Sequence, residues 1–466
     1  MFCKSGRKTL QVALLAAFVG TALVAAGPAA SSSYTITADG TPLTVTTTSA
    51  GENARATFSG TDGQRVALDI DEVTIGTSGC CSMEVSIAKP DGTLLFKKTL
   101  VGRNGAFLNP KTLPSNGTYK ILLDPQGTAK GSATLRLYTV PDNLNVSATA
   151  DGSDNDITIS TPGQNAFFSF SGTAGQRVAV ELPDVIANAK VSIRKPDGSN
   201  LLSPVAVTDG AFLGPRTLPA DGTYKVFLDP QGNSSGDATV RVHTVPANLT
   251  GAIVPDGPSQ TVSLAPGQNA TLTFSGSNGQ RVSLNMTGVT IPNSEVSLVK
   301  PDGSKWVLTV NGDDVTPGQA FLDTKTLPAN GTYKIVVNPR FGGEGDMTLQ
   351  LYDVAADVNG GAVTIDGASQ SLTTTEPGQN GKFTFTVAAN TSFSLDLSSV
   401  TIGSSGCCSA RVSIKKPDGS NLLSPSFFGT AGGSFTKTST VAGTYTIFID
   451  PQNAATGGVT VQLSST

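Results

Sequence analysis

The sequence predicts an all-β protein: four tandem antiparallel β-sandwich or jelly-roll domains of about 105–112 residues each, after an N-terminal signal peptide. Three observations lead to this prediction. One hairpin motif occurs four times, short runs alternate apolar and polar residues between turns, and no segment beyond the leader keeps a helical period. A chain of 466 residues is also longer than one hydrophobic core usually supports, which favours several domains.

The hairpin motif is seen in full at Val191–Leu202, VSIRKPDGSNLL. Pro196 holds φ near the value that a turn needs at its second position, Asp197 can bond back to the main chain, and Gly198 accepts a positive φ. The alternating residues on either side are typical of two paired strands. The same motif returns in three other places, where its turn prolines are Pro90, Pro301 and Pro417.

A second motif, Gly-Thr-Tyr, follows each hairpin. Both motifs recur every 105 to 116 residues, a period typical of a domain rather than of a solenoid repeat. Each copy therefore needs its own core, and we expect the motif's tyrosine at the core edge with its hydroxyl bonded to a neighbouring loop. The predicted domains are 34–142 (copy one), 145–247 (copy two), 250–357 (copy three) and 359–466 (copy four).

Residues 1–30 are predicted to be a secretory signal peptide, because a charged start precedes the apolar run Leu10–Ala26 and then small residues. The alternative is an uncleaved anchor helix, which a short run rich in Ala and Gly disfavours. No later run reaches the roughly 18 apolar residues that cross a bilayer. We therefore expect an exported protein, extracellular or at the cell surface, without a membrane span in the mature chain.

The composition argues against several function classes. Charged residues make up only 14% of the chain and the formal net charge is −4 without a basic block, so no nucleic-acid partner is expected. His243 is the one histidine, which leaves most acid–base and triad chemistry without its usual residue. Because copies one and three carry Tyr138 and Tyr352 in its place, His243 is expected to pack or lie at the surface. We predict that the protein is not an enzyme.

Two pairs of adjacent cysteines occupy the same loop in copies one and four: Cys80-Cys81 and Cys407-Cys408. An exported chain meets an oxidising compartment, so disulfides are expected. Within one domain each cysteine has only its neighbour to pair with, which favours vicinal rings. The alternatives are a bond between copies one and four, or between two chains. A vicinal ring would be a rigid loop staple, an apolar platform for a ligand or a redox sensor.

Two further places are candidate ligand sites. Asp151, Asp154 and Asp156 form an acidic cluster at a domain junction and could hold Ca²⁺, although the spacing is not that of an EF-hand. Trp306 follows the third hairpin, where it could stack on a sugar ring or belong to the core. No other cofactor is expected.

The runs SGTAGQRV (Ser171–Val178), TLPADGTY (Thr217–Tyr224) and LDPQG (Leu228–Gly232), together with KPDG, resemble the bacterial pre-peptidase C-terminal-type β-sandwich. They look still more like repeat modules of large secreted bacterial proteins, some of which carry Rhs-type repeats. The resemblance covers nearly all of residues 34–466 and brings no catalytic motif. It implies a secretion-linked or surface-binding accessory of an extracellular enzyme or toxin, although no catalytic domain accompanies the modules here.

These observations together predict a secreted, non-catalytic binding, adhesion or spacer protein of the bacterial cell surface or matrix. Its expected partners are a glycan, a matrix component or a cell-surface protein, and repeated loop faces would add avidity to weak sites. The alternative is a carbohydrate- or calcium-binding accessory to a separate extracellular enzyme or toxin.

Overall fold

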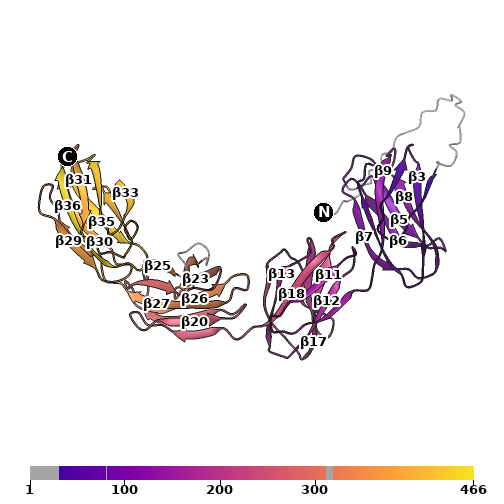
Figure 1. Cartoon of the computed structure of the whole chain (residues 1–466), viewed down its shortest axis with the longest axis horizontal. Helices are drawn as coiled ribbons and strands as arrows, with labels where there is room; N and C mark the ends of the chain where they lie inside the picture. Colours follow the sequence, from indigo (N-terminus) through magenta and orange to yellow (C-terminus); the bar gives the residue numbers. More distant parts are fainter. Residues whose placement is uncertain (1–30, 80, 311–318) are drawn as a thin grey trace, which may run out of the picture. The chain divides into compact units, whose positions relative to one another are not determined.

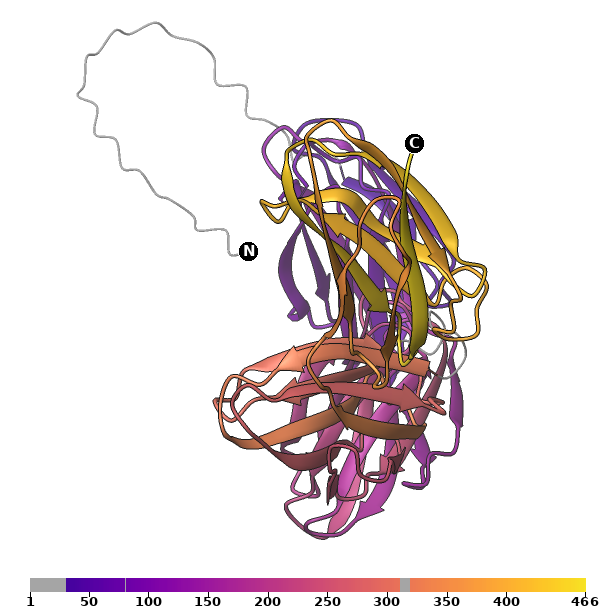
Figure 2. The same ribbon diagram turned by 90° about the vertical axis from the view of Figure 1, so that its left-hand side faces the viewer.

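The computed structural model describes residues 31–79, 81–310 and 319–466, and every regular element in them is a strand (Figures 1 and 2). The all-β prediction is therefore confirmed. Within these residues no helix has the length and apolar character that a bilayer crossing requires. The predicted signal peptide, residues 1–30, lies outside the described residues.

In the described residues the strands follow one order in all four copies, nine to a copy, and the first strand of each copy begins one to three residues before the predicted domain boundary. Copy one contains β1 (Ser31–Thr35), β2 (Leu43–Thr47), β3 (Asn53–Gly60), β4 (Arg65–Asp71), β5 (Met83–Ala88), β6 (Leu94–Val101), β7 (Ala106–Thr112), β8 (Gly117–Pro125) and β9 (Gly131–Thr139). Copy two contains β10 (Leu144–Ser147), β11 (Asn155–Ile159), β12 (Ala166–Gly172), β13 (Arg177–Asp184), β14 (Ala189–Arg194), β15 (Asn200–Ala206), β16 (Ala211–Thr217), β17 (Gly222–Pro230) and β18 (Gly236–Thr244). Copy three contains β19 (Leu249–Ala252), β20 (Gln260–Leu264), β21 (Ala270–Gly276), β22 (Arg281–Thr287), β23 (Ser294–Val299), β24 (Lys305–Val310), β25 (Gln319–Thr326), β26 (Gly331–Pro339) and β27 (Gly345–Asp353). Copy four contains β28 (Val358–Ala362), β29 (Gln370–Thr374), β30 (Gly381–Val387), β31 (Ser392–Ser398), β32 (Ala410–Lys415), β33 (Asn421–Phe428), β34 (Gly433–Thr438), β35 (Gly443–Pro451) and β36 (Gly457–Ser465).

Each copy arranges its strands in a five-stranded and a four-stranded sheet. In copy two the orders are β10-β12-β17-β14-β15 and β11-β18-β13-β16, and the other three copies repeat both orders. The Pro-Asp-Gly turn of this copy joins β14 to β15, which pair antiparallel with two register shifts. The predicted hairpin is therefore present, and it forms one end of the five-stranded sheet.

The prediction of a purely antiparallel fold is wrong at the opposite end of that sheet. The first strand of each copy pairs in parallel with the third, as β10 does with β12. The strand between them, β11, pairs with β18 in the other sheet, so the chain crosses over before it returns in its original direction. The sequence does not predict this first strand, because a segment such as Leu249–Ala252 is short and wholly exposed and shows no apolar alternation.

Among the residues that the structure describes, the buried apolar side chains form four clusters, and none of these clusters contains residues of two copies. Each contains the tyrosine of the Gly-Thr-Tyr motif, which is fully buried and stacks on a phenylalanine of the neighbouring strand. The four hydroxyls donate hydrogen bonds of 2.8–2.9 Å to the main-chain oxygens of Ser115, Ala220, Ala329 and Val441. The core-edge role predicted for these tyrosines is confirmed.

The chain divides into two compact units. The first comprises the described residues up to Asp142 together with Thr161–Gln164, and the second comprises Asn143–Ser160 and Asn165–Thr466. Copies two to four thus lie almost entirely in the second unit.

Candidate functional site

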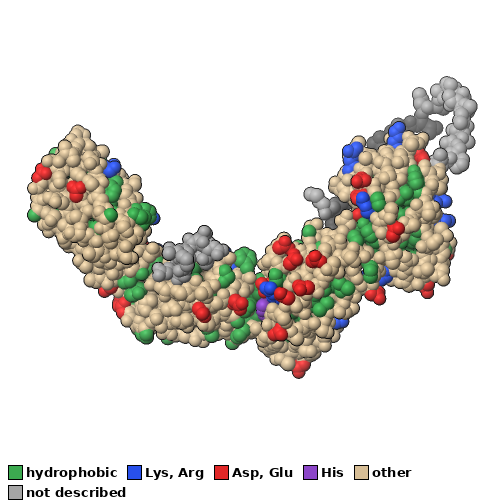
Figure 3. Space-filling view, in the orientation of Figure 1, with side chains coloured by type: hydrophobic (Ala, Val, Ile, Leu, Met, Phe, Trp, Pro, Cys, Tyr) green, Lys and Arg blue, Asp and Glu red, His purple; other side chains and the backbone are tan. Residues whose placement is uncertain are grey.

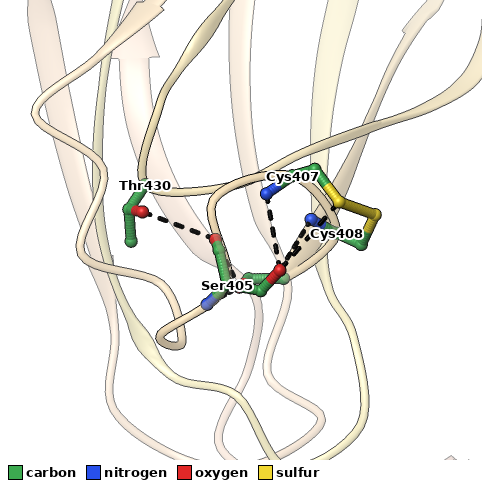
Figure 4. The surroundings of a disulfide bond; sticks show 5 residues. Ser405, Cys407, Cys408 and Thr430 are labelled. Carbon is green, nitrogen blue, oxygen red and sulfur yellow. Dashed lines mark hydrogen bonds between the residues drawn. A yellow bond between two sulfur atoms is a disulfide. The ribbon is translucent and has the colours of Figure 1, made fainter.

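The double-cysteine loop of copy four lies between β31 and β32, and a disulfide joins Cys407 to Cys408 (Figure 4). Ser405 organises the loop: its hydroxyl accepts hydrogen bonds from the N–H groups of both cysteines at 3.4 Å. Its carbonyl oxygen accepts from the Ser409 hydroxyl at 3.2 Å and from the Thr430 N–H at 3.0 Å. Because both cysteines are exposed, the loop presents a rigid ring to solvent.

Copy one builds the same loop with the same main-chain bonds. The N–H of Arg103 donates to the Ser78 oxygen at 3.0 Å, as Thr430 does to Ser405, and the N–H of Cys81 donates to Oγ of Ser78 at 3.3 Å. Cys80 lies outside the described residues. The Cys80–Cys81 ring therefore stays a prediction.

Beside this loop in copy one lies an open cavity of about 560 Å³. Two cations line it, Arg103 and Lys130, and the Nε of Arg103 donates to the Gly76 oxygen at 3.0 Å, which orients the guanidinium. The rest of the lining is mainly hydroxyl and amide, including Ser78, Thr128 and Gln126, and none of the described lining residues is acidic. The cavity thus offers hydrogen-bond donors and positive charge, without a carboxylate or imidazole base. Sequence reasoning missed it, because the loops that form it lie far apart along the chain.

His243 of β18 lies in a charged cluster of copy two, where red and blue side chains adjoin the purple histidine (Figure 3). Its Nε2 is 2.9 Å from Oε2 of Glu181 on β13, and Nη1 of Arg241 is 3.4 Å from the other oxygen of the same carboxylate. Its Nδ1 faces the main chain of Gly152, where an added Cβ would lie 2.9 Å away. Main chain and carboxylate therefore cover the two ring nitrogens, an environment that suits a packed side chain.

The three aspartates of the candidate calcium site have separate partners. Asp151 accepts hydrogen bonds from the hydroxyl and the N–H of Ser153, which lower its pKa to about 2. Asp154 pairs with the Arg241 guanidinium, which lowers the pKa of the carboxyl. Asp156 accepts from the Thr239 hydroxyl at 2.7 Å. The described residues contain no group of three or more His, Cys, Asp or Glu side chains placed to hold a metal ion. Calcium binding stays a prediction without such a cluster to support it.

Trp306 lies on β24, half-buried against the core of copy three. The Nζ of Lys300 lies 4.6 Å from the centre of its ring, so one face carries a cation. A second aromatic feature, which the sequence did not predict, is the pair Phe167 and Phe227 in the five-stranded sheet of copy two. The two rings stack with their centres 4.7 Å apart. The sequence signal that could have revealed this pair is that Phe167 and Phe227 stand at partly exposed positions of β12 and β17, where an alternating strand usually carries a polar residue.

No family model matches the chain, and no curated protein matches it. Among solved structures, it is similar to the Aeromonas hydrophila PliG periplasmic inhibitor of g-type lysozyme, at 16% identity and a TM-score of 0.17, over 22% of this chain and 100% of that one. It is also similar to the CUB1-EGF-CUB2 domain of human MASP-1/3, at 9% identity and a TM-score of 0.15, over 43% of this chain and 99% of that one. The M60 catalytic domain with two CBM51 domains from Clostridium perfringens ZmpB matches at 8% identity and a TM-score of 0.17, over 87% of this chain and 55% of that one. Likenesses of this strength assign neither a family nor a function.

Proposed function

We propose that the chain is a secreted, non-catalytic protein that binds or spaces components of a bacterial cell surface or matrix, built from four tandem β-sandwich domains. The two sheets and the separate buried cluster of each copy support four independently folding domains. The resemblance of its motifs to pre-peptidase C-terminal-type and secreted repeat modules supports export and an accessory role. Its expected partners are a glycan, a matrix component or a cell-surface protein.

One observation carries the binding part of this proposal: copies one and four keep the same frame but change the side chains that face solvent. Gly76 and Gly403 donate equivalent main-chain bonds to the oxygens of Lys130 and Thr456, at 3.4 and 3.2 Å. The same loops carry Arg103 in copy one and Thr430 in copy four. A constant frame with variable exposed residues is the arrangement expected of loops that contact ligands.

The test is binding of the mature chain, residues 31–466, to an array of bacterial glycans, matrix proteins and host surface proteins. We expect saturable binding to at least one class, weaker for any two-copy fragment that folds than for the whole chain, because linked weak sites add avidity. If the mature chain binds nothing on the array, the adhesion proposal is wrong.

A second candidate is a carbohydrate-binding accessory to a separate extracellular enzyme or toxin. The partly exposed rings of Trp306 and of the Phe167–Phe227 pair favour it, since aromatic rings offer a ligand an apolar contact surface. Arg194 lies 4.3 Å from the centre of the Phe227 ring and Lys300 lies 4.6 Å from that of Trp306, so a sugar would contact these cations together with the ring edges. Titration calorimetry with neutral oligosaccharides should detect heat that the Phe227→Ala variant loses. Equal heat from the variant and the parent would count against this role for the aromatic pair.

A further inference from the structure

We infer that the cavity of copy one beside the double-cysteine loop binds an anionic saccharide, held by Arg103 and Lys130. This inference rests on the proposed binding function and names the ligand chemistry of one of its sites.

The charge of the cavity is the first reason. Arg103 and Lys130 enter it from different loops, and neither is in an ion pair with another described residue. The chain as a whole carries a net charge of −4, so two cations together without an acidic neighbour in the lining are a local feature. An anion between them would interact favourably with both at once.

The orientation of Arg103 is the second reason. Its main-chain N–H donates a hydrogen bond of 3.0 Å to the carbonyl oxygen of Ser78. Its Nε donates a second bond, also of 3.0 Å, to the carbonyl oxygen of Gly76. With Nε occupied, the two terminal nitrogens remain to form a paired contact with a carboxylate or sulfate. Holding the side chain in place before binding reduces the entropy lost on association.

The remaining lining is the third reason. Thr77, Ser78, Thr128 and Gln126 supply hydroxyl and amide groups to the lining of the cavity. Such groups hydrogen-bond to the hydroxyls of a sugar, whereas a lipid chain would need apolar walls. A volume of about 560 Å³ lies within the usual range for small-molecule sites.

Copy four provides a natural comparison, because its loops have the same main-chain bonds but carry Thr430 and Thr456 in place of the two cations. The double variant Arg103→Thr/Lys130→Thr therefore introduces residues that this frame already accommodates. A matched control, Lys97→Thr/Lys120→Thr, removes two exposed lysines of the same copy that do not line the cavity.

The experiment is titration calorimetry of the mature chain with three trisaccharides: one of uronic acids, one sulfated and one neutral. We expect at least one anionic trisaccharide to bind through the two cations of the cavity, with affinity falling as salt rises, whereas any heat from the neutral one should not depend on Arg103 or Lys130. The cavity variant should bind at least tenfold more weakly, while the control variant keeps the parent affinity. The pair of anionic probes shows whether the carboxylate or the sulfate is preferred.

The reciprocal variant, Thr430→Arg/Thr456→Lys, places the same two cations in the loops of copy four. It should raise the number of anionic trisaccharides bound per chain from one to two. The inference is overturned if the cavity variant keeps its affinity for the anionic trisaccharides, if it loses neutral and anionic binding alike, or if the reciprocal variant stays at one anion site. Intact hydrogen-exchange protection of β4, β5 and β9 in the cavity variant excludes misfolding as the cause of a loss. Because the array can still reveal partners of other copies, failure of this inference and failure of the proposed function are distinguishable.

Discussion

Gly222 lies directly against the ring of Pro196: a Cβ added to Gly222 would be 2.7 Å from Cγ of the proline. The glycine begins β17, and the proline lies in the turn after the neighbouring strand β14. The same contact occurs in the other copies, between Gly117 and Pro90, Gly331 and Pro301, and Gly443 and Pro417. The two motifs that define the repeat in the sequence are thus the two sides of one contact, which explains why they recur together.

Gly222→Ala should destabilise copy two by about 1–3 kcal/mol, because the new Cβ overlaps Pro196 and the residue has a φ of +139°, which alanine rarely adopts. Hydrogen exchange of β14 and β17 in the full chain measures the loss. Gly214→Ala is the control, since that position has open space and no positive φ, and should change stability by less than about 0.5 kcal/mol. Equal effects of the two variants would show that the contact is unimportant.

Gln268→Ala should destabilise the start of copy three by about 1–3 kcal/mol. The buried carboxamide donates to the Ala247 oxygen at 2.6 Å and accepts from the Ala265 N–H at 3.1 Å, so its removal leaves two main-chain groups unpaired. Gln164 and Gln379 make the equivalent bond in copies two and four. Exchange of the amides in β19 and β20 should rise, whereas the exposed Gln462→Ala should leave its own strand, β36, unchanged. Unaltered exchange in β19 would contradict this role.

In copy one the position of this glutamine is occupied by Glu52. The Glu52→Gln variant should lose a pH dependence that the stability of copy one otherwise shows in acid. The Ser32 hydroxyl and the N–H groups of Thr48 and Ser49 donate to the carboxylate and lower its pKa to about 2, from the usual 4.5. The resulting stabilisation is complete above pH 4.5 and is lost as the pH falls towards 2. Amide exchange of β1, corrected for its intrinsic pH dependence, should show this loss in the parent and not in the variant. The same pH profile in both proteins would rule out Glu52 as the source.

Tyr445→Phe should destabilise copy four by about 1 kcal/mol, because the main-chain oxygen of Val441 loses the hydroxyl that donates to it at 2.9 Å. Tyr445→Ala should cost about 3–5 kcal/mol, since it also removes the ring that stacks on Phe385. Calorimetry of the full chain should show one transition moving while the others stay in place. Shifts in every transition would instead indicate that the four copies unfold as one unit.

The Cys80–Cys81 ring of copy one should resemble the Cys407–Cys408 ring of copy four. Peptide mapping of the unreduced exported chain should find each pair within a single peptide that is blocked to alkylation until reduction. Cross-linked peptides joining copies one and four, or two chains, would support the alternative pairings.

Local chemistry made much of this fold predictable. The turn at Pro196-Asp197-Gly198 and the alternation around it depend only on residues close in sequence, and the four-fold recurrence of Gly-Thr-Tyr pointed to a buried tyrosine in every copy. The parallel pairing of β19 with β21 was not predictable in this way. An exposed edge strand of four residues has no apolar face, so nothing in its own sequence marks it.

The sequence by itself determined the all-β class, the hairpins and the recurrence of one unit, because alternation and turn chemistry act over a few residues. Only the tertiary structure decided which distant residues come together: Gly222 against Pro196, Gln268 on Ala247, and Arg103 with Lys130 in the lining of one cavity. Those meetings depend on how strands remote in the chain pair into sheets, and pairing partners are chosen by packing over the whole copy rather than by any one segment.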